Sequence, residues 1–216
     1  MVTLYYASVP TQIERRATTR QALLDAAAAT LVKRGASGFT TTAVAETAAL
    51  SNGALFRHFP TRLDLVSTTV EHVLAELRGV YASNFNRSAT ATTPEELLEL
   101  LWVCMSDQRL AAVYELYAQC RTDDDLLRSI QPIVMDHLDQ IGVLAATVMT
   151  RIDDPVPPYA VPFVTLAILS MQGLIINNLA GASIGVERDL IIALADSYRL
   201  NRSSPSSGPS PGDPQS

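Results

Sequence analysis

Residues 38–65 contain the pattern that most restricts what this chain can fold into. Two short helical segments are separated by a tight turn, and a longer helix begins directly after them. The first segment is expected to start after Thr40, whose hydroxyl can accept a hydrogen bond from a free backbone N–H of the first turn, and to run to about Ala48. Ser51 can cap the second segment in the same way. The pattern predicts a helix-turn-helix.

The two faces of the second segment differ in chemistry. Leu55 and Phe59 are four residues apart, so both are expected to point inward. Pro60 ends the segment, and Thr61 with Asp64 resembles a capping box for the next helix, with aspartate replacing the usual Glu or Gln. The side chains left outside are able to hydrogen-bond, stack or carry positive charge: Asn52, Gly53, Phe56, Arg57 and His58.

These motifs, in this order, resemble the DNA-reading core of the TetR family of bacterial transcription regulators. The matching runs are residues 48–51 (AALS) and 55–60 (LFRHFP), with residues 23–27 (LLDAA) and 34–35 (RG) resembling the family's first helix and its glycine stop. The resemblance implies that the outer side chains face a DNA major groove, with Ser51 at the start of that helix, while Thr40, Thr41 and Arg62 hold phosphates.

Three positions depart from the family pattern. The turn residue is Ala49 instead of glycine, and a positive φ at alanine costs about 1 kcal/mol. Phe56 replaces tyrosine, which removes a phosphate hydrogen bond and leaves an apolar face for a thymine methyl group. Arg62 takes the place of the lysine usual after the proline.

The net charge of −6 becomes compatible with DNA binding once it is divided along the chain. Residues 1–60 carry six basic and three acidic side chains, a net charge of +3, so the remaining residues sum to −9. Such asymmetry directs DNA toward one end of a protein and away from the other. Cys104 and Cys120 suit a reducing compartment, no secretory signal begins the chain, and no metal or other cofactor is expected; we therefore expect a cytoplasmic protein.

The rest of the chain predicts further helices. Residues 1–17 are expected to form a flexible arm whose Arg15 and Arg16 can approach phosphate, and residues 18–34 the first helix. A long helix over residues 61–83 joins the DNA-binding domain, residues 18–65, to a C-terminal domain, residues 66–202. Helices are also expected over residues 93–105, 107–121, 122–152 (with Pro132 inside) and 186–199, and residues 203–216 form a disordered Pro/Ser/Gly tail.

Residues 155–186 contain no charged side chain, and their apolar run is long enough to cross a membrane. Pro162, Gln172, Asn177 and Asn178 interrupt it, and small residues recur on it. The resemblance implies instead that this helix lies in a homodimer interface. A membrane-associated helical protein remains the alternative, as does a ligand-binding protein on the same scaffold that does not recognise an operator.

The resemblance also implies a cavity between the central helices, and an apolar wall with few polar groups suits an apolar or aromatic effector. Aromatic and methionine stripes are more often plain core. The candidate lining residues are Trp102, Met105, Tyr114, Tyr117, Cys120, His137, Met149, Phe163, Met171 and Gln172. The run Asp123 to Asp125 is better explained as a helix start than as a metal site, and no enzyme motif stands in a matching context.

Together these features predict an all-α protein of about nine helices, with an N-terminal three-helix DNA-binding domain and a larger C-terminal ligand-binding and dimerisation domain. The resemblance implies a transcriptional regulator, not an enzyme, acting as a repressor. Its partners would be a palindromic operator in double-stranded DNA, a second copy of the chain and a small-molecule effector.

Overall fold

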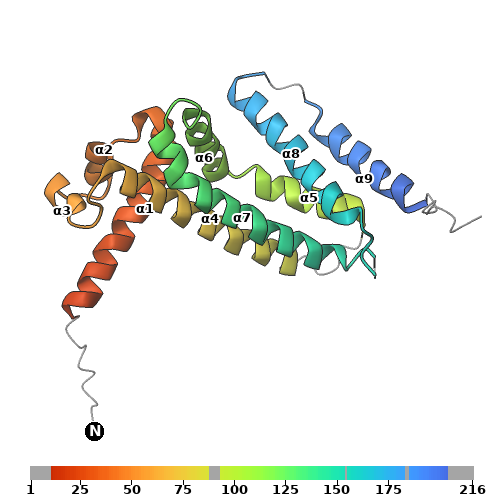
Figure 1. The fold of residues 1–216 in the computed structure, drawn as a ribbon, viewed down its shortest axis with the longest axis horizontal. Helices are drawn as coiled ribbons and strands as arrows, with labels where there is room; N and C mark the ends of the chain where they lie inside the picture. Colours follow the sequence, from red (N-terminus) through yellow and green to blue (C-terminus); the bar gives the residue numbers. More distant parts are fainter. Residues whose placement is uncertain (1–10, 88–92, 154, 183–184, 204–216) are drawn as a thin grey trace, which may run out of the picture. The chain divides into compact units, whose positions relative to one another are not determined.

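The computed structural model describes residues 11–87, 93–153, 155–182 and 185–203, and within these ranges the regular secondary structure is entirely helical (Figure 1). The expected all-α fold of about nine helices is confirmed. The described helices are α1 (Gln12–Gly38), α2 (Thr41–Thr47), α3 (Asn52–Phe56), α4 (Arg62–Arg87), α5 (Pro94–Met105), α6 (Gln108–Gln119), α7 (Asp124–Met149), α8 (Ala160–Leu179) and α9 (Glu187–Ser203).

The chain divides into two compact units. The first contains Met1–Val80 and Ser106–Asp139, and the second contains Tyr81–Met105 and Gln140–Ser216. Helices α4 and α7 therefore each begin in the first unit and end in the second. This structural division does not follow the functional boundary expected at residue 65, which stays a prediction, as does the tail over residues 203–216, of which the structure describes Ser203 alone.

Helix α1 begins at Gln12, six residues before the expected start at Thr18. Its first turn is closed by a capping box, in which the Thr11 N–H donates to Glu14 Oε2 over 2.6 Å and the Glu14 N–H donates to Thr11 Oγ1 over 3.2 Å. The expected arm of residues 1–17 is thus wrong for residues 12–17. Residues 1–10 lie outside the described part of the chain.

The first unit is held together by α1 packing against α2 and α6. Leu23, Ala27 and Leu31 line the buried face of α1, as their register predicts. Helix α1 is interrupted at Gly35, where φ is 66°, and the N–H of the next residue, Ala36, donates to Glu115 Oε2 of α6 over 2.8 Å. The expected glycine stop is confirmed as a break in the backbone, although helical hydrogen bonding resumes to Gly38.

Helix α4 begins with the expected capping box. The Thr61 N–H donates to Asp64 Oδ2, the Asp64 N–H donates to Thr61 Oγ1, and both bonds are 3.0 Å long. Its inward row matches the sequence prediction and is almost fully buried: Leu65, Val66, Thr69, Val70, Val73, Leu74 and Leu77. Helix α7 begins at Asp124 and continues through Pro132.

In the second unit, α5 packs against α8 and α9. The centre of this packing is Tyr198 of α9, which is fully buried and donates from its hydroxyl to Asp153 Oδ2 over 2.7 Å. Arg202 pairs with the other oxygen of that carboxylate at 3.0 Å, and the ring of Phe163 lies 4.8 Å from the ring of Tyr198. Helix α9 is therefore fixed to the unit by its last turns.

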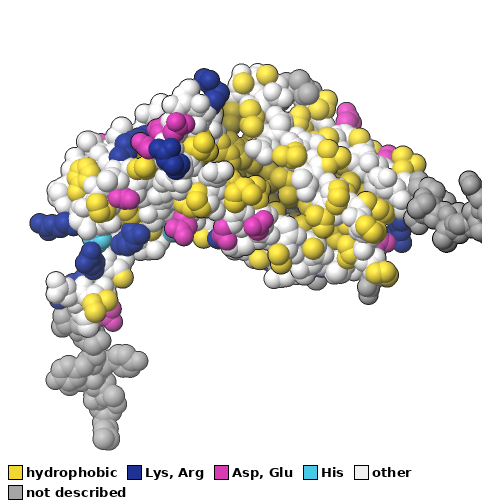
Figure 2. Space-filling model, in the orientation of Figure 1, with side chains coloured by type: hydrophobic (Ala, Val, Ile, Leu, Met, Phe, Trp, Pro, Cys, Tyr) yellow, Lys and Arg dark blue, Asp and Glu magenta, His cyan; other side chains and the backbone are white. Residues whose placement is uncertain are grey.

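Helix α8 is long and apolar enough to cross a membrane; its most apolar 18-residue stretch has a mean hydropathy of 1.7, and 33% of that stretch is buried. Large apolar side chains on its outer face are exposed in the single chain. Figure 2 shows hydrophobic side chains gathered over the part of the surface where Figure 1 places α8. The exposed residues are Val161, Leu166, Leu169, Ile176 and Leu179.

Candidate nucleic-acid interface

Two side-chain caps and one strained residue shape the turn between α2 and α3. Thr40 Oγ1 accepts from the Ala43 N–H, and Ser51 Oγ accepts from the Ala54 N–H, both over 3.1 Å. Ala49 has a φ of 53°, in the left-handed region that favours glycine. The capping and the strained alanine were both expected from the sequence, and both are confirmed.

The inner side of α3 fixes its orientation. Leu55 and Phe59 are almost completely buried, as their spacing predicts. The guanidinium of Arg20 in α1 lies 4.6 Å from the centre of the Phe59 ring, close enough for a cation–π interaction. Helix α3 itself ends at Phe56, with Arg57 as its C-cap and His58 in the following turn, so it is shorter than the sequence suggested.

The outer side of α3 presents the predicted side chains to solvent. Asn52, Gly53 and Arg57 are exposed, and 44% of Phe56 is accessible. The Asn52 amide donates to Thr42 Oγ1 over 3.3 Å, which orients it from α2. A Cβ placed on Gly53 would meet just Ser51 Oγ, at 3.9 Å, so the glycine is not required by the fold.

A cleft of about 700 Å³ lies beside this outer surface. Its lining combines the N-terminal turns of α1 with the residues that follow α3: Gln12, Arg15, Arg16, Thr19, Arg57 and His58. Figure 2 shows basic side chains and a histidine gathered near the end of the molecule that carries α1 to α3. Three guanidinium groups around one cleft provide the charge and the donors that a phosphate backbone requires.

His58 is half-buried in this cleft, less exposed than its outer position suggested. Burial lowers the pKa of its imidazole, and the neighbouring charges of Arg16 and Arg20 lower that pKa further. The ring is therefore neutral near pH 7, with one nitrogen as donor and the other as acceptor. The positive charge of the cleft comes from its arginines.

The remaining predicted DNA contacts lie at helix starts. Thr41 opens α2 and is half-buried, while Arg62 opens α4 and is exposed. Gln12 and Thr19 line the cleft but were not predicted from the sequence, and Arg15 and Arg16 were expected on a flexible arm. The Thr11 and Glu14 capping box is the sequence signal that indicates a helix there. The contacts of all these residues with DNA stay predictions.

The candidate effector-binding residues fall into the two units. Tyr114, Tyr117, Cys120 and His137 lie in the first unit, whereas Trp102, Met105, Met149, Phe163, Met171 and Gln172 lie in the second. In the first set, the rings of Tyr114 and Tyr117 meet edge to face at 5.6 Å, and burial raises the pKa of both phenols. Their role in ligand binding stays a prediction.

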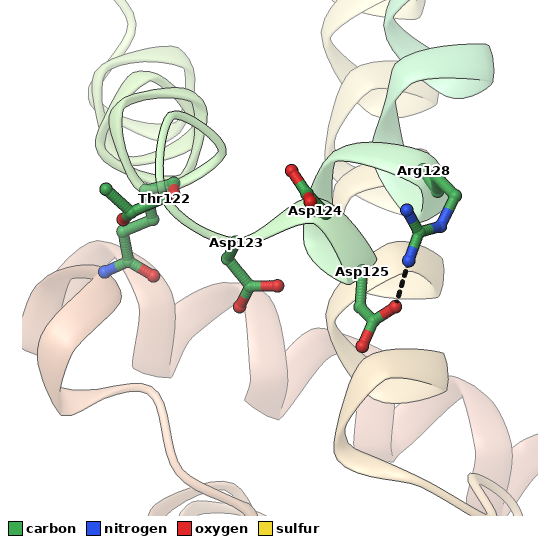
Figure 3. A pocket seen from close by; sticks show the side chains of 6 residues that line it. Thr122, Asp123, Asp124, Asp125 and Arg128 are labelled. Atoms are coloured by element: carbon green, nitrogen blue, oxygen red, sulfur yellow. Dashed lines mark hydrogen bonds and ion pairs between the residues drawn. The ribbon is translucent and has the colours of Figure 1, made fainter.

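An open hollow of about 590 Å³ at the start of α7 is lined by other residues (Figure 3). They are Gln119, Thr122, Asp123, Asp124, Asp125 and Arg128. Asp123 Oδ1 accepts from the Leu126 N–H over 2.9 Å, and Arg128 pairs with Asp125. Asp123 therefore caps α7, in agreement with the helix-start interpretation of this acidic run.

Comparison with known proteins identifies the family of the DNA-binding segment. Residues 23–69, which hold the two caps, the strained turn and the outer face of α3, match the family model described as bacterial regulatory proteins, tetR family. The DNA-binding segment over residues 23–69 is therefore that of the tetR family. Two relatives, uncharacterized HTH-type transcriptional regulators of Mycobacterium bovis and Mycobacterium tuberculosis, are 29% identical over 125 residues, which is 57% of this chain. The match spans 64% of those relatives' length.

Solved structures share this TetR fold over most of the chain. A transcriptional regulator from Rhodococcus sp. Rha1 has a TM-score of 0.63 and 18% identity, covering 84% of this chain and 94% of its own. The multidrug binding protein EbrR complexed with ethidium has a TM-score of 0.60 and 21% identity, covering 82% and 96%. FadR from Bacillus subtilis in complex with stearoyl-CoA has a TM-score of 0.56 and 14% identity, covering 81% and 97%.

Proposed function

We propose that this TetR-family regulator is a cytoplasmic repressor that binds a palindromic operator as a homodimer and is released by a small apolar or aromatic effector. The observation that carries the proposal is the outer face of α3 and its adjoining cleft. Asn52 and Arg57 supply base-edge donors and acceptors, Phe56 supplies an apolar contact, and the arginines of α1 supply phosphate contacts.

The exposed apolar surface of α8 supports the proposed dimer. Its exposed apolar residues form a helix face that a monomer would leave in water, and charged side chains are absent from all the described positions between 155 and 186. A second copy of the chain would cover this face in a two-fold arrangement. Two copies then place two reading helices on half-sites one helical turn apart, or a multiple of that distance.

Effector release rests on the fold and on the apolar side chains of the candidate lining. EbrR and FadR, which share the fold, are seen with ethidium and with stearoyl-CoA, respectively. For release, the effector must bind more tightly to a conformation in which the two reading heads, the α2–α3 segments of the two copies, are wrongly spaced for the operator half-sites. Helix α4 begins after α3 and ends in the second unit, so it is the proposed mechanical link. The proposed action involves no chemical step.

The function is tested by selecting bound fragments from genomic DNA with purified protein, in the presence and absence of a small-molecule extract. The proposal expects enrichment of a palindromic sequence, binding that weakens steeply with added salt, and loss of that enrichment with an active extract fraction. Enrichment that is independent of sequence would contradict operator recognition. Enrichment that no extract alters would contradict effector release and leave DNA binding standing.

A further inference from the structure

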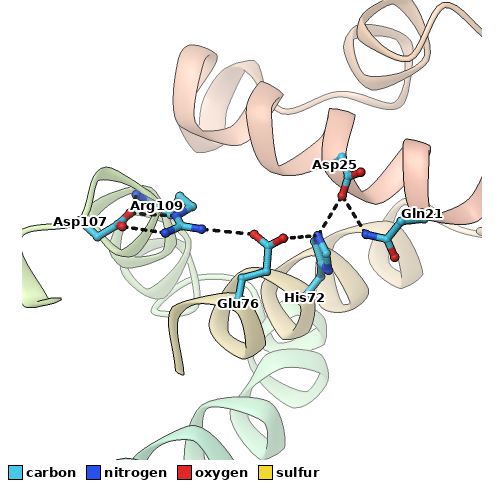
Figure 4. A network of polar contacts seen from close by, with 6 residues as sticks. All are labelled: Gln21, Asp25, His72, Glu76, Asp107 and Arg109. Carbon is cyan, nitrogen blue, oxygen red and sulfur yellow. Dashed lines mark hydrogen bonds and ion pairs between the residues drawn. The ribbon is translucent and has the colours of Figure 1, made fainter. Parts of the chain in front are cut away.

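A polar cluster in the first unit joins α1 to α4 (Figure 4). His72 and Glu76 are four residues apart on one face of α4; His72 points toward Asp25 of α1, and Glu76 lies between His72 and Arg109. His72 Nε2 lies 3.2 Å from Asp25 Oδ1 and 3.5 Å from Glu76 Oε1. One ligand atom from each of the three residues lies within 4.8 Å of the others.

The imidazole nitrogen at the centre of this cluster has no hydrogen bond. His72 Nε2 is inaccessible to solvent, and neither carboxylate contact meets the geometry of a hydrogen bond. The His72 side chain is 14% exposed, whereas the two carboxylates are about half exposed. A buried nitrogen between two carboxylate oxygens needs either a proton or a cation to balance it.

The charges around the cluster favour a divalent cation. Asp25, Glu76 and Asp107 are carboxylates, and Arg109 is the one guanidinium bound to them in the network drawn in Figure 4. With a neutral His72, these groups sum to a charge of −2. Hydrogen bonding from Arg109 lowers the pKa of Asp107, so this carboxylate stays ionised near neutral pH.

Neighbouring side chains hold both carboxylates in place. Gln21 Nε2 donates to Asp25 Oδ1 over 2.8 Å, and Arg109 Nη1 donates to Glu76 Oε2 over 3.2 Å. Asp107 in turn holds Arg109 through bonds of 2.8 and 3.0 Å. Arg109 contacts Glu76 Oε2, so Glu76 Oε1, the oxygen nearer His72, is left for a ligand bond. Outer contacts of this kind orient metal ligands in proteins.

We propose that Asp25, His72 and Glu76 bind a divalent transition-metal ion of the zinc class. Bonds of about 2.0–2.2 Å in tetrahedral geometry place ligand atoms about 3.3–3.6 Å apart, close to the two separations at His72 Nε2. Imidazole with carboxylates selects zinc-class ions over Mg²⁺, which prefers oxygen ligands alone. Three protein ligands leave the fourth position to water.

The site would connect the two helices that frame the reading head. Helix α1 carries Arg15 and Arg16 of the basic cleft, and α4 begins soon after α3. A metal bound at Asp25, His72 and Glu76 fixes α1 against α4 and stabilises the folded head by mass action. This inference is independent of the operator and of the effector.

The test titrates the full-length chain with Co²⁺ as a spectroscopic probe and with Zn²⁺ in competition, followed by equilibrium dialysis with a chelator buffer. The variants are His72→Ala and Asp25→Asn, and Glu71→Gln is the matched control because Glu71 is exposed on α4 beside His72 and outside the cluster. Thermal unfolding with and without Zn²⁺ is followed in parallel, with Mg²⁺ as the comparison ion.

The proposal expects one Co²⁺ per chain with visible absorption bands, displacement by Zn²⁺, and a Tm raised by Zn²⁺ and not by Mg²⁺. Affinity should fall at least about tenfold in His72→Ala and Asp25→Asn and stay unchanged in Glu71→Gln. Three results would overturn the site. These are an equal Co²⁺ affinity in the wild type and all three variants, absorption bands that show cysteine thiolates bound to Co²⁺, and no Co²⁺ binding at all.

Discussion

Ala49 shows how a single residue can be strained by a turn that the rest of the motif fixes. Its φ of 53° is enforced by the caps on both sides and by the Leu50 N–H, which donates to the Ala45 carbonyl over 2.9 Å. The left-handed region costs an L-residue about 1–2 kcal/mol, while glycine costs about 0.5–1 kcal/mol in lost chain entropy.

Ala49→Gly should therefore raise the free energy of unfolding by about 0.5–1 kcal/mol, measured by urea denaturation. Ala48→Gly is the matched control, because Ala48 has a φ of −78° and ordinary right-handed geometry. That change should lower the free energy of unfolding by a similar amount. Two changes of the same sign would show that the turn is not strained at Ala49.

His137 gives the folded chain a pH-dependent stability. Arg78 Nη1 donates to His137 Nδ1 over 3.3 Å, so the imidazole must be neutral. Burial lowers the His137 pKa to about 4, assisted by the Arg78 charge and opposed by the neighbouring Asp136. The unfolded chain protonates near pH 6.5, so this contribution is complete above pH 6.5 and is lost as the pH falls toward 4.

Replacing His137 with glutamine, which can still accept from Arg78, should flatten the pH dependence of unfolding. The wild-type chain should lose about 1.4 kcal/mol per pH unit more than His137→Gln between pH 6.5 and about 4. Urea denaturation at several pH values measures both curves. Parallel curves would contradict a buried neutral imidazole.

At the scale of elements, the sequence predicted the caps and buried rows well, because these depend on neighbours in the chain. Thr40, Ser51 and the Thr61 and Asp64 pair all cap as expected. The early start of α1 was predictable as well, from Thr11 and Glu14. The basic cleft and the cluster around His72 were not, because each joins residues of α1 to residues that only folding brings near.

The contact between α6 and the break in α1 is one such element-level link. Ala36 is almost fully buried, and its N–H depends on the Glu115 carboxylate. Glu115→Ala should lower the free energy of unfolding by about 1–3 kcal/mol, because it leaves a buried donor unpaired. Glu115→Gln retains an acceptor oxygen and should recover most of that loss in urea denaturation. Wild-type stability of Glu115→Ala would show that this contact does not hold α1.

The outer face of α8 distinguishes a soluble dimer from a membrane-associated protein. Leu169 is 60% exposed on this face, and Val103 of α5 is equally exposed. Leu169→Glu should convert the dimer to a monomer in sedimentation velocity, whereas Val103→Glu should leave it intact. After lysis without detergent, the wild-type chain should stay in the supernatant. Its recovery in the membrane fraction would favour the membrane alternative.

At the scale of the whole molecule, a well-defined DNA-binding segment is joined to a C-terminal region whose ligand is proposed. The match over residues 23–69 identifies the DNA-binding segment, and the solved structures share the fold of the chain. In the proposed function a few outer side chains recognise the operator, and among them Arg57, the exposed C-cap of α3, also lines the cleft. Arg57 is therefore the residue on which the assignment of the reading face depends most.

The most direct test is fluorescence anisotropy of a labelled operator fragment, taken from the genomic selection, with wild-type protein and with Arg57→Ala. Loss of one bidentate base or phosphate contact per reading head should weaken binding at least about tenfold while the dimer stays intact. Arg128→Ala, at an exposed arginine of α7 that does not line the basic cleft, should bind as the wild type does. An unchanged Kd for Arg57→Ala would contradict the assignment of this face to DNA.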